Sequence, residues 1–191
     1  MRTPLALLLL LAGCAPDLRA EFPFDGALAG ADHITHEPQP DGSTLSTVDA
    51  TNKTAYVYFD LDSGKELEAG EALESQQWDL SFQRFKISSN GGGSGPGKVR
   101  VLGLKDVAFA SLTTAPKDGY LQDATDSVFT RFEGGWYVYD LGKHKLVPRE
   151  ELLYVVQTGE GAYFKVQLLG YYDANGTAAK PSLKWAKVAP P

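Results

Sequence analysis

The sequence contains few of the residues on which chemistry at protein sites most often depends. Its 191 residues include one Cys, one Met and three His. A single Cys allows no disulfide within the chain and no cysteine-rich metal site. Basic residues are also in deficit, because 18 Lys and Arg stand against 24 Asp and Glu and leave a net charge of −6. This balance argues against a nucleic-acid partner, whose recognition needs clustered positive charge.

Patterns typical of catalysis are missing as well. There is no G-x-S-x-G motif, and a Ser–His–Asp triad would have to use His144, whose neighbours Lys143 and Lys145 are typical of a charged turn. The Gly-rich run 91–97 ends in Lys98 without the Ser or Thr of a phosphate-binding loop, so we expect a flexible loop beside a site. Paired carboxylates of a glycosidase have no sequence pattern, and that alternative stays open. The sequence otherwise indicates a protein that is not an enzyme.

The start of the chain has the layout of an export signal. A positive charge precedes an apolar run at 5–11, which is too short to cross a bilayer, and small residues follow. The segment Leu11-Ala12-Gly13-Cys14 resembles the bacterial lipobox, in which the Cys is lipidated and becomes the first mature residue. We therefore predict a lipoprotein signal peptide at 1–13, export, and a membrane anchor at Cys14. Ala15 in place of Asp favours the outer membrane.

Residues 14–50 are predicted to be a flexible tether, because Pro and Gly recur and apolar periodicity is weak up to about Thr47. His33 and His36 lie in this segment, and the prolines that follow argue against a helix that would place both rings on one metal. We interpret them as part of a solvated loop. Residues 60–71 begin like a calcium-binding loop, but Lys65 stands where Gly is needed, so a hairpin turn is the better interpretation. No metal site is predicted.

From about Thr54 the chain consists of short, aromatic-rich segments in which apolar and polar residues alternate, a pattern typical of strands. This pattern predicts an all-β or mostly β single domain over 51–189. Apolar residues change parity near Gln83, so we predict a β-bulge or bend there. At most, residues 122–132 form a short helix, and Asp173–Gly176 is predicted to be a hairpin turn. The expected strands cover 54–61, 78–87, 99–104, 136–141, 152–157, 163–172 and 183–185.

Three segments, taken in order, resemble a known family. They are YVYFDL at 56–61 followed by Gly64-Lys65, WDLSFQRFKISSNGG at 78–92, and YVVQTGEGAYFKVQLLGYY at 154–172. Together with the lipobox, they resemble the HmuY-like family of bacterial haem-binding lipoproteins. The resemblance extends over about residues 52–188.

This resemblance implies two packed, twisted antiparallel sheets with a few short helices, and haem held in a cleft between loops. Characterised members take haem from host haemoproteins and pass it to an outer-membrane receptor, so a role in iron acquisition is expected. Their axial ligands, two His or Met, lie between the Trp-Asp strand and the Tyr-Val-Val strand. Here the interval 91–151 contains one His and no Met.

The candidate haem ligands are therefore His144, Tyr120 and Tyr137, since a phenolate also binds ferric haem. Trp136 and Tyr139 are candidates to line the cleft, with Trp136 stacking on the ring. The loops 91–98, 119–126 and 142–148 are expected to border it. An alternative stays open, in which the same fold serves as an envelope module that recognises a glycan, a peptide or a partner protein instead of haem.

Overall fold

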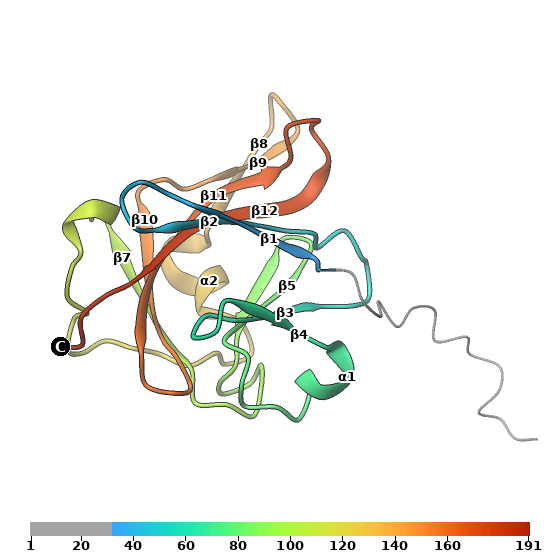
Figure 1. Ribbon diagram of the computed structural model, residues 1–191. Coiled ribbons are helices and arrows are strands. Elements are labelled where there is room, and N and C mark those ends of the chain that lie inside the picture. The colour runs from blue at the N-terminus through green and yellow to red at the C-terminus, as the bar shows by residue number, and fades with distance from the viewer. Residues whose placement is uncertain (1–31) are drawn as a thin grey trace, which may run out of the picture.

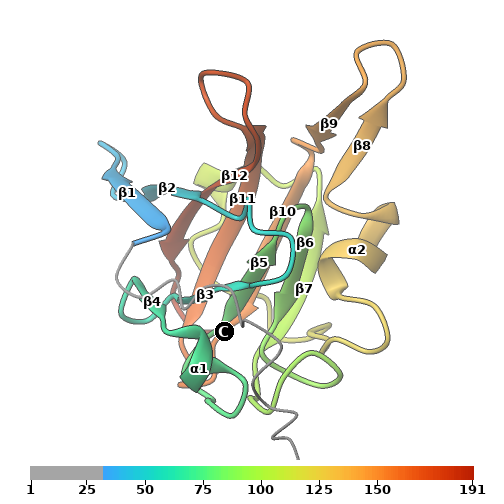
Figure 2. The same ribbon diagram turned by 90° about the vertical axis from the view of Figure 1, so that its right-hand side faces the viewer.

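The computed structural model describes residues 32–191, apart from the side chains of Ala69 and Glu71, and consists mainly of antiparallel strands (Figure 1). The larger sheet has the spatial order β1–β2–β12–β11–β10–β7, and the smaller sheet has the order β4–β3–β5–β6. A separate ribbon of β8 and β9 projects beside α2 (Figure 2). The predicted mostly β fold of packed antiparallel sheets is confirmed.

The strands of the larger sheet are β1 (Ile34–Pro38), β2 (Thr44–Val48), β7 (Arg100–Lys105), β10 (Leu152–Gln157), β11 (Tyr163–Tyr172) and β12 (Ala178–Lys187). Those of the smaller sheet are β3 (Val57–Asp60), β4 (Lys65–Leu67), β5 (Leu80–Gln83) and β6 (Lys86–Ser89). The ribbon consists of β8 (Tyr137–Asp140) and β9 (Lys145–Pro148). The helical elements are α1 (Ala69–Ala72), α2 (Val128–Arg131) and the 3₁₀ turns η1 (Phe109–Ser111) and η2 (Phe132–Gly134).

One hydrophobic core joins the two sheets. Phe59 and Phe82 enter it from the smaller sheet, and Tyr154 and Val166 enter it from the larger sheet, all four being fully buried. Side chains of a strand alternate between its two faces. Accordingly, Val155 between core-facing neighbours belongs to a second cluster on the outer face of the larger sheet, together with Ala115 and Val188.

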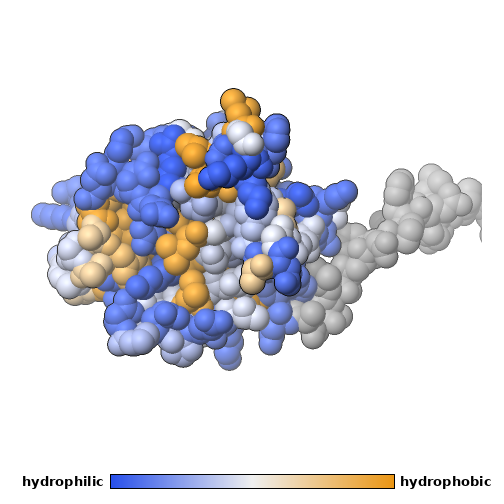
Figure 3. Space-filling view, turned by 90° about the horizontal axis from the view of Figure 1, so that it is seen from above, coloured by the Kyte–Doolittle hydropathy of each residue, from blue (hydrophilic) through white to orange (hydrophobic). Residues whose placement is uncertain are grey.

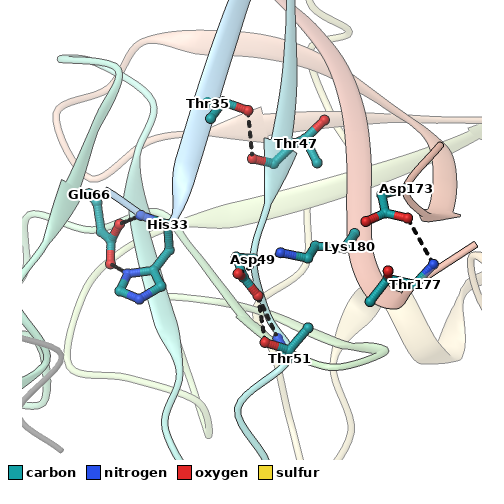
Figure 4. Close-up of polar contacts among 9 residues, drawn as sticks. All are labelled: His33, Thr35, Thr47, Asp49, Thr51, Glu66, Asp173, Thr177 and Lys180. Atoms are coloured by element: carbon teal, nitrogen blue, oxygen red, sulfur yellow. Dashed lines mark hydrogen bonds and ion pairs between the residues drawn. The ribbon is translucent and has the colours of Figure 1, made fainter. Parts of the chain in front are cut away.

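The prediction of a tether over 14–50 is wrong for its second half. β1 and β2 form a hairpin whose β2 pairs with β12, so this segment is part of the larger sheet. The sequence did not predict these strands because the segment is polar: β2 is Thr-Leu-Ser-Thr-Val and buries Ser46 as well as Val48. Polar contacts fix the hairpin (Figure 4): the backbone N–H of His33 donates to Glu66 at 2.7 Å, and Lys180 donates to Asp49.

His33 and His36 are consequently not part of a solvated loop. The His33 imidazole lies 2.8 Å from a Glu66 carboxylate oxygen, in a pair that links the start of β1 to β4. The His36 ring stacks on Phe59 with centroids 5.6 Å apart, and its Nδ1 lies 2.7 Å from the Ser46 hydroxyl. The predicted signal peptide, Cys14 and the first part of the tether lie outside the described residues.

The expected bulge near Gln83 is a chain reversal. β5 and β6 pair directly, with Gln83 opposite Lys86, so Arg84 and Phe85 form a two-residue hairpin turn. Arg84 has a positive φ of 54°, a conformation that a non-glycine residue seldom adopts. The parity change therefore reflects two strands, in which Phe82 and Ile87 lie opposite each other and both face the core.

The short helix expected within 122–132 is α2, which begins after Ser127, whose hydroxyl accepts a hydrogen bond from the Phe129 N–H at 3.2 Å. The hairpin turn after β11 is also confirmed, since Asp173 accepts hydrogen bonds from Asn175 and Thr177. Within residues 32–191, none of the helices has the length and apolar character that crossing a bilayer requires.

Candidate functional site

The Trp-Asp segment holds three parts of the chain together. Asp79 is 1% exposed, and its carboxylate accepts the N–H of Leu61 at 2.9 Å and that of Gly159 at 3.2 Å. Burial raises the pKa of Asp79 to about 7, although these two N–H donors favour the charged form. Asp79 thus ties the β3–β4 turn to the β10–β11 turn.

Asp79 also belongs to an acidic cluster, with Asp60 and Asp62 offering oxygens within 4.8 Å of its own. Asp60 accepts hydrogen bonds from the backbone of Asp62 and from Ser63, as expected in a hairpin turn. The hydrogen bonds of Asp60 thus stabilise the hairpin turn that the sequence predicted within residues 60–71.

Asn90 plays a similar structural part in the Ser-Ser-Asn-Gly-Gly segment. Its side-chain amide donates to the carbonyls of Ser75 and Trp78, and its carbonyl accepts the N–H of Gly97 at 2.9 Å. The Gly-rich loop therefore closes around a buried amide. Gly92 within it has a φ of +64°, and a Cβ there would lie 2.0 Å from the Asp123 carbonyl oxygen. Only glycine allows this approach between the loops 91–98 and 119–126.

Asp123 completes the junction between these two loops. It is 3% exposed, and its carboxylate accepts the N–H of Ser89 at 2.8 Å and that of Val128 at 2.9 Å. The junction places both loops beside α2. That these loops border a ligand site stays a prediction.

A groove of about 370 Å³, which we call the first groove, lies between the β5–β6 turn, these loops and η2. Phe85 and Tyr137, with ring centroids 6.0 Å apart, supply its aromatic lining, and most of the other lining residues have hydroxyl or charged side chains. The lining residues are Phe85, Lys86, Ile87, Ser88, Ser94, Thr125, Asp126, Ser127, Thr130, Gly134, Gly135 and Tyr137. The sequence pointed to Tyr137 and the two loops but not to the β5–β6 turn, because that turn was not recognised.

The candidate ligands do not all meet at this groove. Tyr120 packs on the outer face of the larger sheet, against Tyr163 at 5.8 Å, and is separated from the core by the sheet itself. Burial raises the pKa of the Tyr120 phenol to about 12, which disfavours a phenolate there. Trp136 is 2% exposed, and its indole N–H donates to the Phe85 carbonyl at 3.0 Å. Trp136 therefore supports Phe85 and offers no free face for stacking, contrary to the prediction.

Tyr137, Tyr139 and His144 instead share the β8–β9 ribbon. Tyr137 and Tyr139 are two residues apart on β8 and so lie on the same face of the ribbon. The Tyr139 hydroxyl lies 3.1 Å from His144 Nδ1, which accepts the phenol's hydrogen bond when the ring proton is on Nε2. Tyr139 is 51% exposed. The ribbon thus carries both Tyr137, which lines the first groove, and a solvent-accessible phenol–imidazole pair.

The ribbon that carries this pair also exposes apolar residues. Val138 and Val147 pair across the ribbon, and Leu141 at its turn is 77% exposed. Seen from the side on which the ribbon projects, apolar side chains are exposed among hydrophilic ones (Figure 3). Such exposure on a projecting element is typical of a surface that meets a ligand or a partner.

A second groove, of about 330 Å³, lies on the other side of α2, along the edge of β7. Its lining is mainly apolar, with Arg131 and Glu133 as the charged members. The lining residues are Leu102, Gly103, Gly119, Leu121, Val128, Arg131, Phe132 and Glu133.

These features define a class of protein: an antiparallel β fold whose buried polar residues hold the loops in place and whose surface grooves flank one short helix. The HmuY protein family model matches residues 52–185, and the chain belongs to the HmuY family. A comparison with curated proteins found no match.

Several solved structures share the fold at low sequence identity. The apo HmuY analogue TFO of Tannerella forsythia is 13% identical with a TM-score of 0.59, and the match covers 83% of this chain and 98% of that one. Apo PinO of Porphyromonas gingivitis is 14% identical with a TM-score of 0.56, covering 83% and 98%. A Bacteroides vulgatus protein assigned as HmuY-like and haem-binding is 16% identical with a TM-score of 0.55, covering 81% and 97%.

Proposed function

We propose that this chain is a non-catalytic, lipid-anchored envelope protein that binds haem at the β8–β9 ribbon. The observation that carries the proposal is the solvent-accessible Tyr139–His144 pair, 3.1 Å apart, on the ribbon that also places Tyr137 in the lining of the first groove. Membership in the HmuY family supports the same ligand. Anchoring at Cys14 would place the domain at the outer membrane, where an outer-membrane receptor is the expected recipient of haem.

The donor chemistry fits haem. A phenolate is an established protein ligand of haem iron, and an imidazole that accepts a hydrogen bond from the ligand orients it. Tyr139 would hold the iron, His144 would orient the phenol and take up its proton, and Phe85 and Tyr137 would offer apolar contact to the ring. Lys86, which lines the first groove, provides a cation for an acidic substituent. Bound haem supplies a ferric centre, and the protein supplies its ligand and orientation.

A second ligand class has support from the lining of the first groove. Ser88, Ser94, Thr130 and Asp126 supply hydroxyl and carboxylate groups beside the two aromatic rings. Aromatic faces combined with polar side chains suit a sugar, which has apolar faces and many hydroxyls. A glycan is therefore the alternative ligand, and it would bind without using the Tyr139–His144 pair.

The test is a haemin titration of the chain from residue 15, followed by its Soret absorption. The core clusters lie within residues 34–188, so this chain retains them. We expect a shifted band that saturates at one haem per chain, together with the charge-transfer absorption of phenolate-bound ferric haem. In Tyr139→Phe that absorption should disappear, and affinity should fall by roughly tenfold or more, as expected for loss of an iron ligand. Tyr120→Phe is the matched control, since it removes a tyrosine hydroxyl from the outer face of the larger sheet, away from the ribbon.

Two results would contradict the proposal. A Soret band no different from that of haemin with an unrelated acidic protein would remove haem as the ligand. A saturable band that is identical in Tyr139→Phe and the parent chain would leave haem as the ligand but move the iron away from the ribbon.

A further inference from the structure

The β7 edge of the larger sheet is only partly covered. β7 pairs with β10 on one side, while on the other side Val101 exchanges two backbone hydrogen bonds with Leu121, at 2.8 and 2.9 Å. The segment that contains Leu121 covers β7 only at Val101. Gly119, two residues before Leu121, has a φ of +93°, and among the described residues no strand pairing is found on this side of β7 after Val101. β7 therefore continues past its cover with a free edge.

The direction of the backbone groups on this edge follows from the pairing. In an antiparallel strand, alternate residues direct their N–H and C=O groups to the same side. Because Val101 points both groups toward Leu121, Gly103 and Lys105 point theirs outward as well, whereas Asp106 donates inward to Glu151 at 2.8 Å. Within residues 32–191, no hydrogen-bond partner is found for the N–H or C=O of Gly103 on this outer side.

The second groove opens along this free edge. Leu121, 54% exposed, and the ring of Phe132 border it, and Val128 forms part of its buried wall. The groove therefore offers an apolar pocket next to an unpaired backbone donor and acceptor. An added strand supplies a matching donor and acceptor at this spacing, with a side chain to fill the pocket.

The charges at the groove indicate what such a strand carries. Arg131 is exposed and uses one N–H on the Gln122 carbonyl at 3.0 Å, and among the described residues no carboxylate lies within ion-pair distance of it. Glu133, the acidic member of the lining, is already paired with Lys105 at 3.1 Å. An Arg guanidinium with free donors is well suited to a carboxylate, which it can bind through two parallel hydrogen bonds.

We propose that the free edge of β7 binds the C-terminal end of an extended peptide. The peptide pairs with Gly103 as an added strand, places one apolar side chain in the second groove, and sets its terminal carboxylate on Arg131. This site is separate from the β8–β9 ribbon and does not depend on haem binding. Its occupant is a partner protein with an exposed, extended C-terminus.

The test starts from a library of random heptapeptides with free C-terminal carboxylates, selected on the chain from residue 15. We expect enrichment of peptides with an apolar residue near a free carboxylate. The selected peptide should slow hydrogen exchange at the Gly103 N–H, measured by NMR, because that group becomes paired. Arg131→Glu should weaken binding by roughly tenfold or more, as should amidation of the peptide's C-terminus.

Lys117→Glu is the control, because it makes the same reversal of charge at an exposed position that does not line the groove. It should leave affinity unchanged, and circular dichroism should show that both variants are folded. Three outcomes would overturn the proposal: no peptide enriched above background, a selected peptide that binds Arg131→Glu as tightly as the parent, or unchanged Gly103 exchange in the complex.

Discussion

Asp79, Asn90 and Lys165 lie in two of the three sequence segments that resemble the HmuY family, and each makes hydrogen bonds with backbone groups outside its own segment. Lys165 is 9% exposed and donates to the carbonyls of Phe109 and Leu112, which attaches η1 to the larger sheet. Removing such a partner leaves buried backbone groups unpaired, at a cost of about 1–3 kcal/mol each. These polar residues of the matching segments therefore stabilise the fold.

Asp79 makes stability depend on pH in an unusual direction. Its pKa is raised from 3.8 to about 7 on folding, so the folded state binds its proton more tightly than the unfolded state does. The contribution of this group to stability is therefore present below pH 4 and is lost as pH rises toward 7. The size of the effect is on the order of a few kcal/mol. Urea unfolding between pH 4 and 8 measures it.

Asp79→Asn is the comparison, because a neutral amide does not titrate. Asn loses one of the two backbone hydrogen bonds, so the variant should be less stable at pH 4 by about 1 kcal/mol. The difference in free energy of unfolding between parent and variant should then shrink or reverse above pH 7. Parallel stability curves for the two proteins across this range would show that Asp79 does not titrate as described.

At the scale of elements, alternation predicted the strands with large apolar residues and failed for the others. β10 and β11 have the bounds that the sequence predicted, because large apolar residues face the core at every second position of β10 and of β11 as far as Leu168. β1 and β2 were missed because polar residues occupy most of their positions, and partners far along the chain decide their pairing. The β5–β6 turn was missed because it contains neither Gly nor Asn, the usual residues of such turns.

The candidate site was predictable to a similar degree. The sequence identified His144, Tyr137 and Tyr139, and the β8–β9 ribbon brings them onto one element. It could not separate them from Tyr120, because which face of the sheet a loop residue covers depends on the path of that loop. Trp136 was misjudged for the same reason, since its burial under the β5–β6 turn depends on a tertiary contact.

The contact between the two loops beside the first groove depends on Gly92. Gly92→Ala should destabilise the protein by about 2–4 kcal/mol, because the new Cβ would meet the Asp123 carbonyl at 2.0 Å and the φ of +64° is itself unfavourable for Ala. Gly176→Ala separates the two causes. Gly176 has a φ of +82° but no atom within 4 Å of the position that a Cβ would take, so its cost should stay near about 1–2 kcal/mol. Thermal or urea unfolding of both variants measures the difference, and equal losses would show that the loop contact adds nothing.

At the scale of the whole molecule, the edges of the sheets carry both proposed sites. The haem site uses the β8–β9 ribbon, which forms a two-stranded sheet of its own, and the peptide site uses the free part of β7. The opposite end of the larger sheet is the edge strand β1, whose sequence ends in Pro38, a residue that cannot donate a backbone hydrogen bond. The proposed peptide site and the β1 edge therefore lie at opposite ends of the same sheet.

The domain boundary follows from this arrangement and can be tested directly. The family match begins at residue 52, yet β1 and β2 contribute Ile34 and Val48 to the core. A chain that begins at Thr51 should lose several kcal/mol relative to one that begins at Asp32, since each of these side chains contributes about 1.5–3 kcal/mol when buried. It also loses the Ser46 hydroxyl that accepts the Trp185 indole N–H at 2.7 Å, and it exposes β12 as a new edge. Urea unfolding and light scattering of the two chains provide the measurement. Aggregation or a large loss of stability is expected only for the shorter chain, whereas equal midpoints would mean that the first two strands are dispensable and that the core is complete without them.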